Sequence, residues 1–218
     1  IRVESSSRLD VIRTIRPFID SDESPEKSAL FHNTNAGKNL LSLDLTKPEG
    51  KAVALDLVRW CDVVTESFSP KAMKAFGLDY ESLLEVNSDL IMLSTCLFGQ
   101  TGPLSMFAGY GNLAAAIAGF YTITGWPDRE PAGPFGAYTD YIAPRYNAAA
   151  ILAALDYRDR AGEGQHIDLA QAESAMHFLT PAILDYMAND KVQSRIGNSD
   201  PNCAPHGVYP VSGEDAYI

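Results

Sequence analysis

The side chain with the clearest chemical potential is one aspartate, Asp140, in the segment FGAYTDYIAP (residues 135–144). It lies between Tyr138 and Tyr141, and an alanine-rich segment follows. An aspartate near the start of a helix most often caps the helix or interacts with its dipole. A carboxylate in a partly apolar setting can also attack an activated carbonyl carbon. The residues alone leave these roles open.

A second candidate is the glycine motif GYGNLA (residues 109–114), which fits the G-x-G-x-x-G/A pattern of dinucleotide sites. Such a site needs a preceding strand and an acidic residue at the end of a second strand. The preceding LSMFA is a poor strand, and no acidic residue stands at the expected distance. The motif therefore predicts a tight turn before a helix.

The histidines and serines show no pattern of a metal site or a serine nucleophile. The chain has no H-x-x-x-H or H-E-x-x-H pair, no C-x-x-C pair and no G-x-S-x-G elbow. We therefore expect no metal. Structural roles are expected for the four histidines, His32, His166, His177 and His206.

The charge balance limits the possible partners. With 17 basic and 28 acidic side chains, the formal charge of −11 argues against nonspecific nucleic-acid binding. A polyanionic ligand would need a few local donors or helix N-termini. The longest apolar stretch, around residues 113–123, is shorter than the roughly 20 residues that cross a bilayer. Neither nucleic acid nor a membrane is expected as a partner.

The cysteines bear on the cellular compartment. Their number is odd, and two of the three, Cys61 and Cys96, lie in apolar runs, while Cys203 does not. This usage predicts buried, reduced thiols in a cytoplasmic protein.

The elements that must position these residues alternate between strands and helices. Strands are expected over residues 39–45, 62–68 and 90–98, the last of which is apolar on both faces, as in a buried parallel strand. A helix is expected to follow TKPEG, where Thr46 and Glu49 have the spacing of a capping box and Pro48 suits the first turn. The alternation predicts an α/β fold with a parallel sheet.

The second half of the chain continues this pattern. The loop GQTGP (residues 99–103) follows the third strand, at the sheet edge where α/β proteins bind ligands. A small-residue helix over residues 112–121, a strand over 166–170 and a helix over 171–189 are expected. A further helix over 143–160 should begin where Pro144 allows. One stripe of this helix would carry Tyr146, Ala149, Ala150, Ala153 and Tyr157. The inward side chains of the last helix would be Met176, Leu179, Ile183 and Met187.

Several motifs in one order give the chain a family resemblance. They are NAGKNLLSLDLTKPEG, CDVVTESFSPKAMKAFGLDYESLLEVNSDLIMLSTCLFGQTGP, YTITGWPDREP and DYIAPRYNAAAILAALDYRDRAGEGQHIDLAQAE. Together they resemble the class III CoA-transferase family, of the formyl-CoA and carnitine type, over nearly the whole chain. The resemblance implies a Rossmann-like large domain, whose parallel sheet has flanking helices, and a smaller second domain.

The resemblance also implies a mechanism. In the family, one aspartate near the start of the alanine-rich helix attacks the thioester of an acyl-CoA, and the matching residue is Asp140. A mixed anhydride and then an enzyme-bound CoA thioester follow, and the acceptor acid leaves as its CoA ester. Coenzyme A is thus expected as substrate and product.

The CoA contacts carry over with departures. Leu43 and Phe68 match binding positions of the family, and Ser67 stands where asparagine is usual. Three further positions differ from basic residues found in some members: Thr46, Ala75 and Ala108. Lys71 and Lys74 are near enough in sequence to substitute for them, although both also fit an exposed helix face.

Two alternative functions remain at this point. Racemases of 2-methylacyl-CoA share the fold and pair the aspartate with a histidine, but the corresponding position holds Tyr110, a weak base at neutral pH. A non-catalytic partner subunit is the alternative from another class.

The resemblance finally implies a domain arrangement and an assembly. Residues 1–190 would form the central part of the large domain with a linking helix, and residues 191–218 a linker and the start of the small domain. Both ends look cut from a longer chain. Members of the family form interlaced homodimers, so a second copy of the full-length protein is the expected partner.

Overall fold

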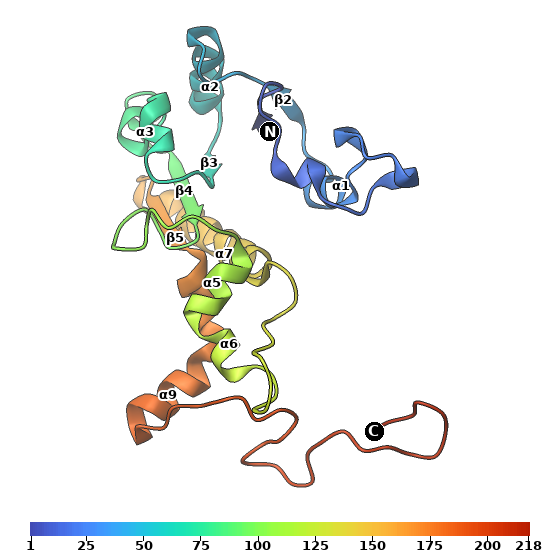
Figure 1. The fold of residues 1–218 in the computed structure, drawn as a ribbon. Coiled ribbons are helices and arrows are strands. Elements are labelled where there is room, and N and C mark those ends of the chain that lie inside the picture. The colour runs from blue at the N-terminus through green and yellow to red at the C-terminus, as the bar shows by residue number, and fades with distance from the viewer. The chain divides into compact units, whose positions relative to one another are not determined.

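A computed structural model describes all 218 residues, which form two compact units (Figure 1). The first unit comprises Ile1–Asp62 and Lys74–Ser88, and the second comprises Val63–Met73 and Asp89–Ile218. Each unit contains its own parallel sheet. The parallel strands and flanking helices confirm the α/β class.

The first unit is built on a pair of short parallel strands, β1 (Arg2–Glu4) and β2 (Leu40–Ser42). The connection between them contains three 3-10 turns and one helix, η1 (Val11–Thr14), η2 (Ile19–Ser21), η3 (Pro25–Lys27) and α1 (Ala29–Asn35). The helices α2 (Pro48–Trp60) and α4 (Tyr80–Leu84) complete the unit, and α3 (Ala72–Phe76) brings the chain back to it.

One buried arginine organises the polar segment after β1. The Arg13 guanidinium, only 5% exposed, forms an ion pair with Glu4 at 2.9 Å and lies 3.5 Å from the centre of the Phe31 ring. Its hydrogen bond to Glu4 holds the pKa of that carboxyl group below its usual range. The polar segment after β1 is thus ordered around the buried Arg13 charge, which is paired with Glu4 and shielded from solvent.

The prediction of a capping box at the start of α2 is wrong. Pro48 is the first helical residue, as predicted, but the N-cap is Lys47 and no side chain caps the helix. The Thr46 hydroxyl donates instead to Asp44 at 2.6 Å, and the Thr46 N–H donates to the same carboxylate at 3.0 Å. The Thr46 side chain is therefore engaged in the turn before the helix by its bonds to Asp44, and it does not cap α2.

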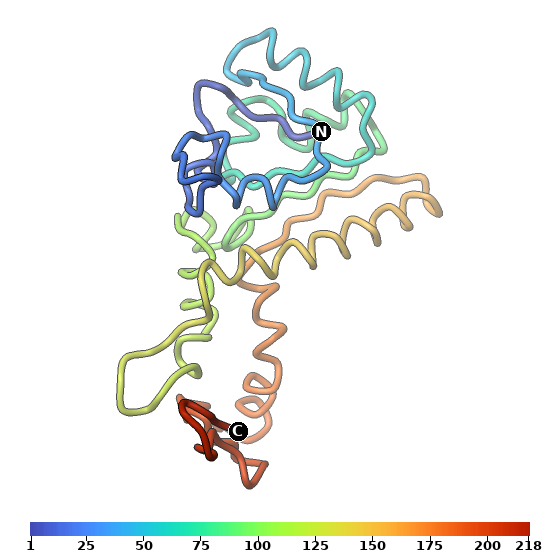
Figure 2. The backbone as a smooth tube through the Cα atoms, turned by 90° about the vertical axis from the view of Figure 1, so that its right-hand side faces the viewer, coloured from blue at the N-terminus to red at the C-terminus, as the bar shows by residue number.

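The second unit contains the three-stranded parallel sheet β3 (Val63–Glu66), β4 (Ile91–Cys96) and β5 (His166–Ala170), in the order β3–β4–β5. Ile91, Met92 and Leu93 in the central strand are at most 1% exposed, which confirms the predicted buried strand. The long helix α7 (Tyr138–Ala161) lies beside β5 and also contacts β4 (Figure 2).

Smaller helices lead away from this sheet (Figure 1). They are α5 (Gly111–Ala118), α6 (Phe120–Ile123), α8 (Gln171–Met176), η4 (His177–Leu179) and α9 (Thr180–Asn189). The helix α8 is in contact with β5, α5 packs on α8, and the other three lie farther from the strands. Ala115 and Ala175 are fully buried with Ile142 in one apolar cluster, so the small side chains let α5, α7 and α8 approach closely. The expected small-residue helix is confirmed.

The start of α7 differs from the prediction. The helix begins at Tyr138, not after Asp140, and Pro144 lies inside it. The side chains of Thr139 and Ile142 are buried, and this tertiary contact outweighs the helix-breaking tendency of proline. The stripe predicted from the sequence is not the buried face of the helix, because Ala149, Ala153 and Tyr157 are exposed. The buried residues of α7 are Thr139, Ile142, Ala143 and Ala154.

The expected helix over residues 171–189 is interrupted by η4, and Pro181 lies in the first turn of α9. Leu179 is buried as predicted, but Ile183 and Met187 are 40% and 74% exposed. After α9 the chain is irregular and ends in a short hairpin, where Tyr209 and Ile218 exchange backbone hydrogen bonds of 2.8 and 2.9 Å. The assignment of residues 191–218 to a second domain stays a prediction.

The three cysteines are thiols that form no disulfide, but Cys61 and Cys96 are only half-buried, less than expected. None of the helices is long and apolar enough to cross a membrane.

Candidate functional site

The starts of three helices meet at Asp140. This residue lies in the first turn of α7, and its Oδ2 accepts a hydrogen bond of 3.2 Å from the N–H of Gly111, the first residue of α5. Gln171, the first residue of α8, hydrogen-bonds to the same carboxyl group. Helix N-termini carry unpaired N–H groups and partial positive charge. The arrangement therefore offsets part of the free-energy cost of burying a negative charge on this side chain.

Gly111 is required by the closeness of α5 to α7. A Cβ atom on Gly111 would lie 2.6 Å from the Ala137 carbonyl oxygen and 2.7 Å from the Asp140 nitrogen, both of which are backbone atoms. The φ angle of Gly111 is not positive, so its role is close approach and not a strained turn. This contact explains the second glycine of the GYGNLA motif, and the helix expected after it is confirmed.

A buried threonine connects α7 with α8. The Thr139 hydroxyl donates to Gln171 Oε1 at 2.9 Å and lies 3.4 Å from the Gly111 carbonyl oxygen. Sequence patterns alone indicated neither Thr139 nor Gln171 as a site residue. The position of Gln171, directly after a parallel strand at the carboxyl edge of the sheet, was the available signal.

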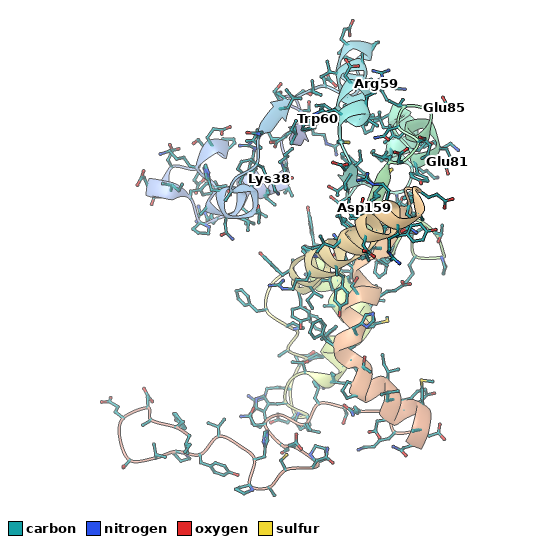
Figure 3. All side chains as sticks on the ribbon, turned by 180° about the vertical axis from the view of Figure 1, so that it is seen from behind. Lys38, Arg59, Trp60, Glu81, Glu85 and Asp159 are labelled. Carbon is teal, nitrogen blue, oxygen red and sulfur yellow. The ribbon has the colours of Figure 1, made fainter.

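The environment of Asp140 acts on its pKa in two directions. Burial raises the pKa, because it disfavours the charged carboxylate, whereas the hydrogen bonds from Gly111 and Gln171 lower it. Burial is the larger effect, so the pKa is raised. Many other carboxylates of the chain, such as Glu81, Glu85 and Asp159, stand on the exposed surface (Figure 3). Asp140 is thus a half-buried carboxylate whose hydrogen-bond partners are neutral groups.

The residues after β3 form a second part of the same sheet edge. The buried carboxylate of Glu66 accepts the N–H of Phe68 at 2.7 Å and so fixes the turn that carries Ser67 and Phe68. Ser67 is exposed and the Phe68 ring is 47% exposed. Both side chains are accessible to a ligand, as a CoA contact requires.

The loop after β4 is anchored to β5. Both carboxylate oxygens of Asp168 accept the N–H of Gln100, at 2.9 and 3.0 Å. Gly99 has a φ of 79°, a conformation that glycine adopts without strain. The N–H of Ala172 donates to the Leu97 carbonyl at 3.0 Å and ties the start of α8 to the same loop. The GQTGP loop is therefore held at the sheet edge where it was expected.

The predicted CoA contacts are divided between the two units. Ser67, Phe68 and the exposed Lys71 belong to the second unit, as Asp140 does, whereas the half-buried Leu43 and the exposed Lys74 belong to the first. The roles of these five residues stay predictions.

The first unit contains a hollow of about 420 Å³ at the N-terminus of α2. It is lined by Leu45, Thr46, Lys47, Pro48, Lys51, Ala75 and Phe76. Two lysines, Lys47 and Lys51, thus flank the first turn of a 13-residue helix. Thr46 and Ala75 are among the positions compared with the family above, whereas the two lysines are not. Their signal in the sequence is TKPEGK, where basic residues surround a predicted helix start. Such a hollow suits an anionic group.

Comparison with known proteins gives consistent matches. The sequence profile of CoA-transferase family III matches residues 1–218. The succinate–glutarate CoA-transferase of Agrobacterium fabrum is 41% identical over 97% of this chain and 54% of its own length. The succinyl-CoA:glutarate CoA-transferase of Homo sapiens is 30% identical over 100% of this chain and 48% of its own length.

A solved structure shows the same fold. A CAIB/BAIF family protein from Brucella suis matches with a TM-score of 0.88 and 38% identity, over 99% of this chain and 56% of that chain. The chain described here therefore spans about half the length of the relatives it matches.

Proposed function

Because the chain belongs to CoA-transferase family III, we propose that the protein moves CoA from an acyl-CoA donor to a carboxylic acid acceptor, with Asp140 as the covalent carrier. The observation that supports this role best is the half-buried Asp140 carboxylate, which receives a hydrogen bond from the start of α5. A role as a simple cap of α7 fits less well, because the carboxylate bonds to a different helix.

The proposed reaction has four steps. A carboxylate oxygen of Asp140 attacks the thioester carbon, and the CoA thiolate leaves a mixed anhydride. The thiolate then attacks the aspartyl carbonyl carbon and releases the donor acid, which leaves an aspartyl-CoA thioester. The acceptor carboxylate attacks this thioester and expels the thiolate, giving a second anhydride. The thiolate finally attacks the acceptor acyl carbon, which releases the product and restores the Asp140 carboxylate. Each intermediate keeps the acyl group activated.

The geometry around Gly111 suits the two middle steps. When the thiolate or the acceptor attacks the aspartyl carbon, negative charge develops on the carbonyl oxygen of Asp140. Oδ2 already accepts the Gly111 N–H at 3.2 Å, so this donor stands where the oxyanion forms. Oδ1 would then be the oxygen that attacks in the first step. One N–H thus serves both the resting carboxylate and the tetrahedral intermediates.

Binding of CoA by a chain with a charge of −11 needs local positive groups. We propose that the hollow beside Lys47 and Lys51 takes phosphate groups of CoA, in addition to the contacts proposed for Leu43, Ser67, Phe68, Lys71 and Lys74. The N-terminus of α2 would contribute to the same attraction.

The relatives suggest a substrate class. The names of both relatives given above include succinate or succinyl-CoA and glutarate, which are short dicarboxylic acids or their CoA ester. We therefore propose a short dicarboxylic acid as acceptor and the CoA ester of another as donor. An interlaced homodimer and a cytoplasmic location remain part of the proposal.

A covalent-labelling experiment tests the catalytic role. The intact protein is mixed with succinyl-CoA and analysed by intact-mass spectrometry, with and without hydroxylamine. A CoA-sized, hydroxylamine-sensitive adduct is expected, and it should be absent in Asp140→Asn and Asp140→Ala. Asp159→Asn, an exposed carboxylate on the same helix, is the matched control and should keep the adduct. An adduct that persists in both Asp140 variants would exclude Asp140 as the carrier.

A further inference from the structure

The hydrogen bonds around Asp140 continue beyond its direct partners. Gln171 bonds to the Asp140 carboxyl group with one end of its amide and accepts the Thr139 hydroxyl at 2.9 Å with the other. Thr139 and Asp140 are neighbours on α7, and Gln171 begins α8. The three side chains thus form a short chain that starts and ends on the same turn of one helix.

The chemistry of these groups determines which way the Gln171 amide faces. A carboxylate has only acceptors, so the amide must present its NH₂ to Asp140. Its oxygen then faces Thr139, whose hydroxyl has one proton to donate. The opposite orientation would place the amide oxygen against the carboxylate and leave the amide nitrogen against the threonine. Each bond therefore favours the orientation that the other one needs.

Burial removes the alternatives open to Thr139. The residue is 0% exposed, so its hydroxyl is shielded from solvent. The only other acceptor within reach is the Gly111 carbonyl oxygen, which is farther away at 3.4 Å. A buried hydroxyl that gave up its bond to Gln171 would thus exchange a short bond for a long one. The orientation of Gln171 is accordingly fixed from the side opposite to Asp140.

We propose that Thr139 and Gln171 are a positioning pair, which holds the Asp140 carboxyl group in one orientation and keeps it ionised for attack on the thioester. Thr139 acts only through Gln171. This inference rests on the proposed function for its consequence in catalysis, but not for its effect on the carboxyl group itself.

Other ionisable groups near this site are few. The helix α5 contains none, and Tyr110 precedes it; α8 contributes the exposed Glu173, and η4 contributes His177. On α7 the nearest are Tyr138, Tyr141 and Arg145, of which Arg145 bonds to the Tyr141 carbonyl. The pKa of Asp140 therefore depends chiefly on burial and on its bonds to Gly111 and Gln171.

Four variants of the intact protein separate positioning from packing. Gln171→Met keeps the length of the side chain and removes its hydrogen bonds. Thr139→Val keeps the shape and removes the hydroxyl, whereas Thr139→Ser keeps the hydroxyl and is the rescue variant. Gln193→Met is the matched control, because Gln193 also donates to a carboxylate, that of Asp185 at 3.4 Å, outside this site.

The first readout is the pH dependence of adduct formation with succinyl-CoA. Without the bond from Gln171, the Asp140 pKa rises, so less carboxylate is present at a given pH. The acid limb of the rate should therefore move to higher pH in Gln171→Met, with a loss of about tenfold or more below the midpoint, since a hydrogen bond to an ionised group is typically worth that factor. Thr139→Val should shift the limb in the same direction, and Thr139→Ser and Gln193→Met should not.

The double variant Thr139→Val/Gln171→Met tests whether the two residues act in series. If Thr139 acts through Gln171, the double variant should be no slower than Gln171→Met alone. Effects that multiply would overturn the series arrangement. An unchanged midpoint in both Gln171→Met and Thr139→Val, even with reduced thermal stability, would overturn the proposal, because a merely structural role changes stability and not the midpoint.

The second readout needs no turnover. The ¹³C-carboxyl signal of Asp140, identified by its loss in Asp140→Asn, can be titrated by NMR in each variant. A higher midpoint in Gln171→Met supports the positioning pair even if no CoA adduct forms, in which case only the proposed function fails. An unchanged midpoint together with a normal adduct would leave the proposed function standing and overturn the positioning pair.

Discussion

The N–H of Gly111 donates to Oδ2 of Asp140 at 3.2 Å across a sequence separation of 29 residues. This contact exists only because two helices start side by side, with the backbone of α5 against the backbone of α7. The position of the proposed nucleophile is therefore determined by helix packing as well as by its own helix.

The first prediction concerns this contact. In Gly111→Ala the new methyl group would meet two backbone atoms at 2.6 and 2.7 Å, so α5 and α7 must move apart. We expect adduct formation with succinyl-CoA to fall on the order of 100-fold, because small displacements of reacting groups have effects of that size. Gly109→Ala is the matched control, since its methyl group would meet only the movable Leu113 side chain. Equal rates for both variants would contradict the prediction.

The second prediction concerns stability and pH. Because burial raises the pKa of folded Asp140 above its unfolded value, the charged form is disfavoured in the folded state. The stabilising contribution of this group is present below the unfolded pKa and is lost as the pH rises through the folded pKa. Asp140→Asn should consequently raise the Tm at pH 7, on the order of 2 °C, with a smaller gain at pH 4. Differential scanning calorimetry at the two pH values checks this, and a lower Tm at pH 7 would refute it.

The third prediction compares two arginines of one segment. Arg13 is buried with Glu4, so Arg13→Met leaves a covered carboxylate without its partner and should lower the free energy of unfolding by about 3–5 kcal/mol. Arg16 pairs with Glu23 on the surface, where both side chains are more than half exposed. Arg16→Met should therefore change the free energy of unfolding by less than about 1 kcal/mol. Chemical denaturation of the two variants measures the difference. Similar losses would show that Arg13 does not organise the first unit.

The fourth prediction concerns the hollow in the first unit. Lys51→Met should weaken CoA binding about tenfold at low salt, and less at high salt, because the lost attraction to phosphate is screened by ions. Lys38→Met is the control, since Lys38 is exposed in the same unit and does not line the hollow (Figure 3). Isothermal titration calorimetry of the intact protein provides the affinities. If Lys71→Met and Lys74→Met weaken binding and Lys51→Met does not, the phosphates lie elsewhere.

A fifth prediction separates transfer from racemisation. Tyr110 stands at the N-cap position of α5 without a side-chain capping bond and is 62% exposed, at the position where a racemase is expected to carry histidine. In deuterated water with a 2-methylacyl-CoA and no acceptor acid, we expect no exchange at the α-carbon. Mass spectrometry of the recovered substrate measures whether deuterium has entered at the α-carbon. Exchange that disappears in Asp140→Asn would favour the racemase.

Local sequence patterns were sufficient to locate the strands of the three-stranded sheet, although the strand expected at residues 39–45 pairs with β1 in a separate sheet. The strand β5 was predicted with its observed bounds, and the burial of β4 followed from its unbroken apolar run. Asp140 could also be located near a helix start from sequence alone. Such features depend on residues close in the chain, which is where periodicity and turn signals are informative.

Features that depend on distant residues were not predictable in this way. The bond between Thr139 and Gln171 spans 32 residues, and nothing in either local sequence indicates it. The start of α7 was placed too late, because the burial of Thr139 and Ile142 extends the helix past a proline that ordinarily ends one. Ile183 and Met187 fit an inward stripe by spacing, yet α9 has no buried residue.

Pro144 has a consequence for the nucleophile itself. Proline has no N–H, so the main-chain carbonyl of Asp140 lacks the donor that the next turn of a regular helix would supply. The first turn of α7, which bears the reacting group, is therefore joined to the next turn by one backbone hydrogen bond fewer than in a regular helix. During catalysis the aspartyl carbon changes from planar to tetrahedral and back. The missing hydrogen bond allows this turn to shift slightly without breaking a backbone hydrogen bond of the helix at Asp140.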